Sequence, residues 1–314
     1  MGVFLQKPTV FYHKQERCGE SLLSPCLYSL GGKWAMEAYV TNLAKTINIM
    51  DMQKTLEYVK SRQISVARFG DGEIDLMTGH SIPYQDYDED LAKRLKQIIT
   101  MPDNDRFLVC LPDVFDRRER YNFACNTFWD GHLKRYENFY NEIVISEKLY
   151  GSTFLSRPYI DLEDKSKSGE HFQNLKDLFS DKDLLIVEGI YSRSGVGNDL
   201  FQGAKSIERV ICPSRNAYSK YGIILDTIRQ YGKNRLILLM LGPTAKALAC
   251  DLAFEGYWAI DIGHIDSEYE WYKMGATHKV KFNNKHTAEF NFDECIELQN
   301  DDIYNREIVA LLSD

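Results

Sequence analysis

The sequence lacks any apolar run long enough to cross a membrane, since no window approaches about 18 uncharged apolar residues. The first twenty residues show no charged segment followed by an apolar core, so we expect no secretory signal. Myristoylation is not expected either, because Gln6 stands where that motif needs Ser or Thr. Together these absences predict a cytoplasmic protein.

The sequence also lacks an excess of basic over acidic residues, and it lacks closely spaced cysteine pairs. The chain of 314 residues carries 38 Lys and Arg against 46 Asp and Glu, a net charge of −8. This balance argues against extensive nucleic-acid binding, but it leaves room for a small basic pocket for a phosphorylated ligand. The seven cysteines are an odd number and form no CxxC pair, which favours a reducing compartment. Apolar residues at 44% and charged residues at 27% are typical of a globular protein.

No internal repeat, low-complexity tract or long linker divides the chain. Residues 1–50 are irregular and rich in aromatic and turn residues, and we interpret them as an amino-terminal extension. Residues 51–290 alternate between helical and strand patterns and form the expected functional domain. Residues 291–314 are the carboxyl-terminal tail.

The expected strands are short, continuous apolar runs without polar alternation. This pattern is typical of parallel strands that are buried on both faces, and its alternation with helical patterns predicts an α/β layered domain. The runs are ISVARF, RFLVCLP, DLLIVEG, RVICP, RLILLMLG and YWAIDIG. Helices are expected near 51–62, 88–99, 116–140, 216–230 and 244–255.

Four strand-to-helix junctions open with glycine: GDGE at 70–73, GIYSRSGVGND at 189–199, GPTAK at 242–246 and GHIDSEYEW at 263–271. In open parallel sheets, ligands bind beyond the carboxyl ends of the strands. We therefore expect the four junctions to meet at one site.

The first junction places two carboxylates one residue apart. Asp71 and Glu73, loosened by Gly70 and Gly72, can both turn toward Mg²⁺ or Mn²⁺ while ligand phosphates complete the coordination shell. Alternatively, the two acids cap the following helix or pair with Arg68. Acid-x-acid triplets recur in this chain, so it is the position after a buried strand that favours the metal role.

The second junction has the composition of a phosphate-binding loop. Gly195 and Gly197 allow the backbone to approach a ligand, and successive amides can form an anion-binding nest. Arg193 offers a planar fork for a diphosphate, and Asn198 can bond a ribose or a base. The alternative is a plain flexible turn. The dinucleotide fingerprint is incomplete because Leu200 stands where a third glycine is required, which makes an NAD-dependent oxidoreductase less favoured.

The third junction turns at Gly242 and opens a helix near Pro243 or Thr244. A helix amino terminus at the sheet edge holds phosphate oxygens readily, although helix capping alone explains the stretch. The spacing GxxxxGK[ST] is missing, so this is not a P-loop.

The fourth junction concentrates titratable side chains. His264, Asp266, Glu268 or Glu270 could take the proton from an attacking hydroxyl group. The Asp266-x-Glu268 triplet could instead supply metal ligands in competition with the first junction. Equally, a surface helix carries such acids without any function.

Taken together, the chain resembles the GT-D-type glycosyltransferases, formerly a domain of unknown function from gene clusters that glycosylate serine-rich-repeat bacterial adhesins. The resemblance runs from about 60 to 290. It is carried by RFGDGE, SRPYID, VEGIYSRSGVGNDLF, LGPTAKALACDLAFEGYWAIDIGHIDSEYEW, Lys285 and Glu289.

The resemblance implies a Rossmann-like, mostly parallel sheet with helices on both faces. It implies a Mn²⁺ or Mg²⁺ ion held by an Asp-x-Glu motif, which we place at Asp71 and Glu73, and transfer of a hexose, commonly glucose, from a UDP-sugar to a glycan or glycoprotein acceptor. Other glycosyltransferases are possible partners. The residues expected to contact the nucleotide sugar are Arg68, Gly70, Arg193, Gly195, Gly197, Asn198, Gly242 and Thr244.

Two rival functions remain at this level. A metal-dependent nucleotide phosphohydrolase would use the same carboxylates. A catalytically silent partner of another glycosyltransferase would bind the nucleotide sugar without turning it over.

Overall fold

The computed structural model describes residues 28–30, 33–35, 46–290, 293 and 296–312. The chain divides into two units, residues 1–37 and 38–314. In the first, β1 (Tyr28–Leu30) pairs antiparallel with β2 (Lys33–Ala35). Most of the expected extension at 1–50 lies outside the described residues. Among the residues that the structure describes, no helix has the length and apolar character needed to span a membrane.

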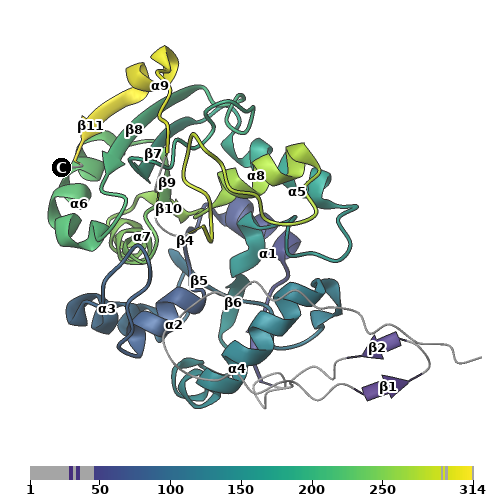
Figure 1. Cartoon of the computed structure of the whole chain (residues 1–314). Helices are drawn as coiled ribbons and strands as arrows, with labels where there is room; N and C mark the ends of the chain where they lie inside the picture. The colour runs from purple at the N-terminus through teal and green to yellow at the C-terminus, as the bar shows by residue number, and fades with distance from the viewer. Residues whose placement is uncertain (1–27, 31–32, 36–45, 291–292, 294–295, 313–314) are drawn as a thin grey trace, which may run out of the picture. The chain divides into compact units, whose positions relative to one another are not determined.

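The second unit contains a nine-stranded sheet in the order β11-β8-β7-β9-β10-β4-β5-β6-β3, and every neighbouring pair is parallel (Figure 1). This confirms the α/β prediction. The strands are β3 (Asn48–Ile49), β4 (Ser65–Arg68), β5 (Phe107–Leu111), β6 (Leu149–Ser152), β7 (Asp183–Gly189), β8 (Ser206–Cys212), β9 (Leu236–Met240), β10 (Trp258–Asp261) and β11 (Ile308–Leu311).

Helices cover both faces of this sheet. They are α1 (Met52–Arg62), α2 (Asp71–Met77), α3 (Glu89–Ile99), α4 (Phe123–Ile143), α5 (Ser168–Phe179), α6 (Tyr221–Tyr231), α7 (Thr244–Phe254), α8 (Ile265–Met274) and α9 (Asp302–Glu307). One core packs α2, α3, α4, α6 and α7 against the sheet, and the other packs α1, α5 and α8.

Strand β7 shows why the strands have no polar alternation. Leu184 and Ile186 point into the core beneath α1, α5 and α8, whereas Leu185 and Val187 point into the opposite core. Because successive side chains of a strand point to opposite faces, a strand covered on both faces must be apolar at every position.

Helix boundaries follow local capping. The Asp88 carboxylate accepts a hydrogen bond from the Leu91 amide at 2.9 Å, which starts α3 where the sequence predicts it. The helix expected at 116–140 instead begins at Phe123, because the Asn122 side chain caps it through the Cys125 amide at 3.0 Å.

Strand β10 occupies the central position in the topology. It comes late in the chain, yet it lies between β9 and β4. On one side of β10 lie β4, β5 and β6 in chain order, and on the other side lie β9, β7 and β8. The loops that follow β4 and β10 therefore leave the sheet in diverging directions, and such a reversal opens a crevice at the carboxyl ends of the strands.

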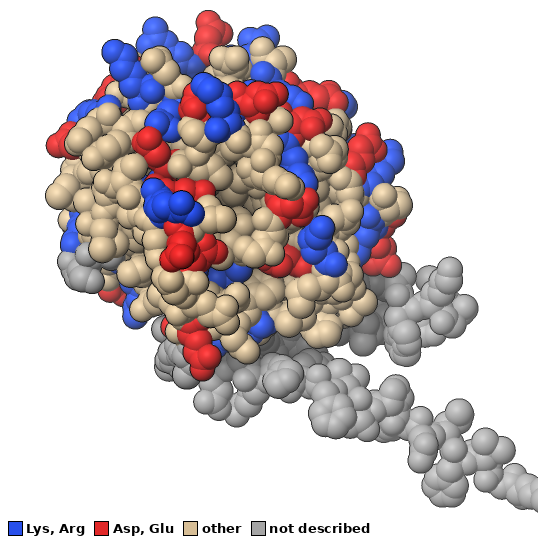
Figure 2. All heavy atoms as spheres, turned by 90° about the horizontal axis from the view of Figure 1, so that it is seen from above, with Lys and Arg blue, Asp and Glu red and all other residues tan. Residues whose placement is uncertain are grey.

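Charge is evenly mixed over the face that carries α9. Figure 2 shows basic and acidic side chains interspersed there, with tan surface around a shallow hollow. This face therefore has no extended basic patch of the kind that binds nucleic acid.

Candidate active site

A buried network of four charges lies where β4 and β10 end. The Asp261 carboxylate accepts hydrogen bonds from the backbone amide of Arg68 at 3.0 Å and from its guanidinium at 3.2 Å. Lys246, at the start of α7, places its ammonium 3.1 Å from Asp261 and 2.9 Å from Glu73. Burial alone would raise the pKa of Asp261, but Lys246 and Arg68 outweigh it and hold this pKa below its usual range. The network fixes the junctions after β4 and β10 to each other.

Glu73 is fully engaged in this network. One carboxylate oxygen contacts Lys246, and the other accepts the amide hydrogen of Gly70 at 2.7 Å, as a helix-capping residue does. The sequence left metal binding, helix capping and pairing with Arg68 open for the two acids. For Glu73 the structure shows capping, with Lys246 as its ionic partner.

Asp71 differs from Glu73 in having a carboxylate that is half-buried and open. No other described residue forms a hydrogen bond or an ion pair with its side chain. Burial raises the pKa of Asp71 to about 6, and the negative charges of Glu73, Glu289 and Asp75 add to this effect. A concentration of negative charge of this kind would be relieved by a cation.

A wall of aromatic rings, from Tyr84, His264 and His286, lies near Asp71. The Tyr84 ring lies edge-on to His264 with centroids 6.3 Å apart, and His264 lies 5.4 Å from His286. Burial, with help from His286 and Arg157, lowers the pKa of His264 to about 3, so its imidazole is neutral at physiological pH. Burial and the nearby carboxylates of Glu73 and Asp71 raise the pKa of Tyr84 far above its usual range.

Arg157 and Lys279 form a basic pair at the site that sequence reasoning missed. Arg157 contacts Glu289 at 2.7 Å and Asp161 at 2.9 Å, and Lys279 contacts Glu289 at 2.7 Å. Burial raises the pKa of Glu289, but Arg157 and Lys279 outweigh it and keep this carboxylate ionised. The one signal for Arg157 in the sequence was the segment SRPYID at 156–161. That segment was noted because it resembles the family, and residue spacing gave no reason to select it.

Glu268 lies beneath this pair and is completely buried. One of its oxygens accepts the Ile160 amide hydrogen at 3.1 Å, and the other lies 3.7 Å from Arg157 Nε without a hydrogen bond. Burial raises the pKa of Glu268 to about 7, and Arg157 opposes this rise.

Asp266 and Glu270 join α8 to the loop after β7. Asp266 accepts hydrogen bonds from the Gly195 amide at 2.8 Å, from Asn198 Nδ2 at 2.9 Å and from Lys285 Nζ at 2.9 Å. Glu270 binds the same Asn198 and Lys285 side chains at 2.8 Å and 2.9 Å. The structure therefore brings these four predicted residues, Gly195, Asn198, Asp266 and Glu270, close together. Their polar groups bind one another and Lys285.

Arg193 is directed toward the carboxyl-terminal segment. Its guanidinium donates a hydrogen bond to the Gln299 carbonyl at 2.9 Å and lies 4.6 Å from the centre of the Tyr304 ring. The carboxyl-terminal tail, residues 291–314, thus contributes β11 to the sheet. It also contacts the loop after β7 through Gln299 and Tyr304. Contact between Arg193 and a diphosphate stays a prediction.

The start of α7 has an unused polar group. The Thr244 hydroxyl is fully buried and has no hydrogen-bond partner in the described part of the chain, and no side chain caps this helix. Gly242 precedes it with φ of +51°, and a Cβ there would meet the Tyr84 ring at 3.0 Å. The turn before α7 therefore needs glycine.

Gly263→Ala is expected to destabilise the fold strongly. Gly263 has φ of +51°, and an added Cβ would lie 1.7 Å from Arg68 Nη2, so the buried Arg68–Asp261 pair would have to move. We expect a loss of about 3 kcal/mol in the free energy of unfolding, measured by denaturant titration. Gly275→Ala is the control: its φ is +64° but no atom lies within 4 Å, so only about 1 kcal/mol should be lost. Equal losses in both variants would contradict the crowding argument.

No group of three or more His, Cys, Asp or Glu side chains that could hold a metal lies within residues 46–290, 293 and 296–312. Asp71 by itself fits a cation that takes its remaining ligands from phosphates and water, as Mg²⁺ commonly does. Glu73 accepts the Gly70 amide hydrogen with one oxygen and pairs with Lys246 through the other, and its role as a metal ligand stays a prediction.

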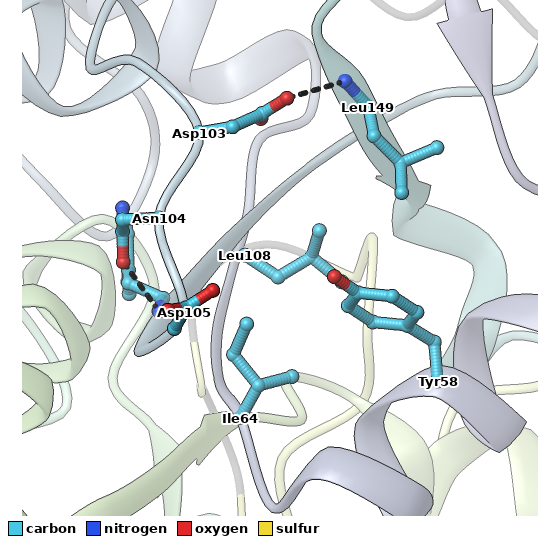
Figure 3. A pocket seen from close by; sticks show the side chains of 8 residues that line it. Tyr58, Ile64, Asp103, Asn104, Asp105, Leu108 and Leu149 are labelled. Atoms are coloured by element: carbon cyan, nitrogen blue, oxygen red, sulfur yellow. Dashed lines mark hydrogen bonds between the residues drawn. The ribbon is translucent and has the colours of Figure 1, made fainter.

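A small pocket of about 190 Å³ lies at the opposite end of the sheet, near the amino ends of β5 and β6. Figure 3 shows the Asp103 carboxylate bonded to the Leu149 amide beside Tyr58. This pocket is separate from the candidate site.

Several known proteins are similar to this chain. The family model described as glycosyltransferase GT-D fold matches residues 66–290. A solved structure described as "The highly conserved domain of unknown function 1792 has a distinct glycosyltransferase fold" is 58% identical, with a TM-score of 0.84, and the match covers 86% of this chain and 97% of that one. "A New Glycosyltransferase (DUF1792) from Streptococcus sanguinis" is 56% identical, with a TM-score of 0.83, over 85% and 99% of the two chains.

Two curated proteins are also similar. "Probable glycosyl transferase Gly" of Streptococcus gordonii is 55% identical over 86% of this chain and 39% of its own length. "Glycosyltransferase GlyD" of Streptococcus pneumoniae serotype 4 is 52% identical over 84% of this chain and 32% of its own length. The chain therefore spans about a third of the length of these relatives.

Proposed function

The chain belongs to the family of glycosyltransferases with the GT-D fold, and we propose that it transfers a hexose, glucose in the first instance, from a UDP-sugar to a glycan acceptor on a glycoprotein. The observation that carries this proposal is the open Asp71 carboxylate at the reversal point of the sheet. Its pKa is raised, as active-site carboxylates commonly are.

The donor would lie across the carboxyl ends of β4, β10 and β9. Asp71 would hold Mn²⁺ or Mg²⁺, and this cation, when bound, would neutralise the charge of the diphosphate. The start of α7, which no side chain caps, would bind phosphate oxygens through its free backbone amides. Glu73 acts through Lys246, because that ion pair fixes the beginning of α2 and so the direction of Asp71.

The ring wall is suited to exclude water from the sugar. Tyr84 and His264 are both uncharged at neutral pH, so they can pack against the donor and donate or accept hydrogen bonds without competing for the cation. Exclusion of water matters because a transferase must prevent hydrolysis of its donor.

The acceptor and the setting follow from the resemblance. A glycan on a serine-rich bacterial glycoprotein is the proposed acceptor, other glycosyltransferases are the proposed partners, and the cytoplasm is the proposed location.

The test is a panel of nucleotide sugars incubated with the protein and Mn²⁺ or Mg²⁺, with and without glycan acceptors, followed by measurement of released UDP. UDP release that depends on both metal and acceptor supports the proposal. Release that ignores the acceptor and is accompanied by free phosphate indicates a hydrolase. Thermal stabilisation by UDP and Mn²⁺ without turnover indicates a silent binding subunit.

A further inference from the structure

His286 and Asp293 form a pair at the site that the predicted residues do not include. His286 Nδ1 lies 2.6 Å from an Asp293 carboxylate oxygen. The backbone amide of His286 donates to the Tyr191 carbonyl at 2.7 Å, which anchors this histidine to the loop after β7. Both the ring and its backbone are therefore held in place.

The position of the pair brings it to the ring wall. The His286 ring lies 5.4 Å from His264, which follows β10. The side chain of His286 remains 20% exposed, and no other described residue bonds its second ring nitrogen, Nε2. This nitrogen can therefore meet a ligand without breaking an existing bond.

Three groups in the described part of the chain contact His286. Asp293 comes from its own segment, His264 from the start of α8, and Tyr191 contributes its backbone carbonyl. The adjacent Lys285 turns its ammonium away to Asp266 and Glu270.

The four bases expected from the sequence are less suited to accept a proton. Asp266 and Glu270 are held by Asn198 and Lys285, and Glu268 has no exposed surface. His264 is open, but burial makes its imidazole hard to protonate.

We propose that His286, oriented by Asp293, is the general base that takes the proton from the acceptor hydroxyl. This inference rests on the proposed transferase function. A carboxylate on one ring nitrogen fixes the tautomer and supports the charge that the other nitrogen gains, as in nucleophile–base–acid arrangements.

The step is a single displacement. The acceptor oxygen attacks the anomeric carbon of the donor and forms the new C–O bond, while the bond from that carbon to the diphosphate oxygen breaks. The electron pair leaves with UDP, and the hydroxyl proton passes to His286 Nε2 and then to solvent. Because attack and departure are on opposite sides, the anomeric configuration inverts.

His286→Gln is expected to lower kcat for transfer by about 10²- to 10⁴-fold, with unchanged KM for the donor. Asp293→Asn should lower kcat less and shift the acidic limb of the pH–rate profile, because Asn cannot support the imidazolium. His278→Gln, at an exposed histidine outside the site, is the control and should retain full activity. Added imidazole should partly restore His286→Ala.

Two further measurements separate a catalytic role from a structural one. The His286→Gln protein should bind UDP and Mn²⁺ in calorimetry as the wild type does, and NMR should show an inverted product. Full transfer by His286→Gln, a retained configuration, or loss of UDP binding in that variant would each overturn the inference. Absence of transfer by the wild type with every nucleotide sugar would instead overturn the proposed function.

Discussion

The Asp71→Asn variant is expected to lose metal-dependent sugar transfer by about 10³-fold or more while it becomes slightly more stable. The loss follows because the proposed cation would lose the open Asp71 carboxylate, and charge stabilisation by a metal is worth several kcal/mol. Transfer is measured as acceptor-dependent release of UDP over a range of Mn²⁺ concentrations.

The gain in stability follows from the raised pKa of Asp71. The folded pKa of about 6 lies above the ordinary value of 3.8 for an aspartate, so this carboxyl destabilises the fold once pH rises through that window. Asparagine removes the cost, and without metal the Tm should increase by about 2 °C at neutral pH.

Glu73→Gln is the matched comparison within the same motif. It breaks the ion pair with buried Lys246, so we expect a loss of about 2 kcal/mol in the free energy of unfolding. Opposite stability effects at two acids one residue apart would support their assigned roles. Full metal-dependent activity in Asp71→Asn would contradict the assignment of the cation to this carboxylate.

Asp261→Asn is expected to cost about 3–5 kcal/mol in the free energy of unfolding, because it leaves Arg68 and Lys246 buried without their shared partner. The measurement is denaturant unfolding followed by circular dichroism. Asp226→Asn is the control, since its pair with Arg229 is exposed and should contribute less than about 1 kcal/mol.

The cost of Asp261→Asn should depend on pH with a definite sign. The pKa of Asp261 is depressed in the folded state, so its contribution is present above the unfolded value of about 4 and is lost as pH falls through the folded value. The difference between wild type and variant should therefore shrink in acid. A difference that stays constant to low pH would show that the carboxylate charge is not the stabilising feature.

The sequence was sufficient for the layered fold because double-sided burial leaves an unmistakable apolar pattern. It was not sufficient for every strand. Strand β6, LYGS, has little apolar content, and Gly151 is needed because a Cβ there would lie 2.5 Å from Cys110 Sγ. That requirement comes from the neighbouring strand β5, which local pattern does not reveal.

Within the site, the glycine junctions correctly located the loops that converge, but spacing could not tell which acids are open. Asp71-x-Glu73 and Asp266-x-Glu268 have identical spacing. They differ in the partners that come from distant parts of the chain. Lys246 pairs with Glu73 in the first triplet, and the Gly195 amide binds Asp266 in the second. Only the folded chain brings these together.

In residues 276–290, resemblance alone identified Lys285 and Glu289, and Lys279 and His286 were missed. This segment contains no helix or strand in the structure, and yet it supplies Lys279, His286 and Glu289 to the site. A segment without regular structure has no hydrophobic period, so its position could not be inferred from pattern. Glu289 has φ of +65°, a left-handed conformation that non-glycine residues seldom adopt.

The place of β10 has a consequence for how this protein is made. A ribosome delivers β4 almost two hundred residues before the strand that must lie beside it. Until Trp258–Asp261 emerges, β4 exposes an open edge and the Arg68 side chain has no counterion. Sheet closure must therefore wait for late synthesis, so slow maturation and a transient need for chaperones are expected of this topology.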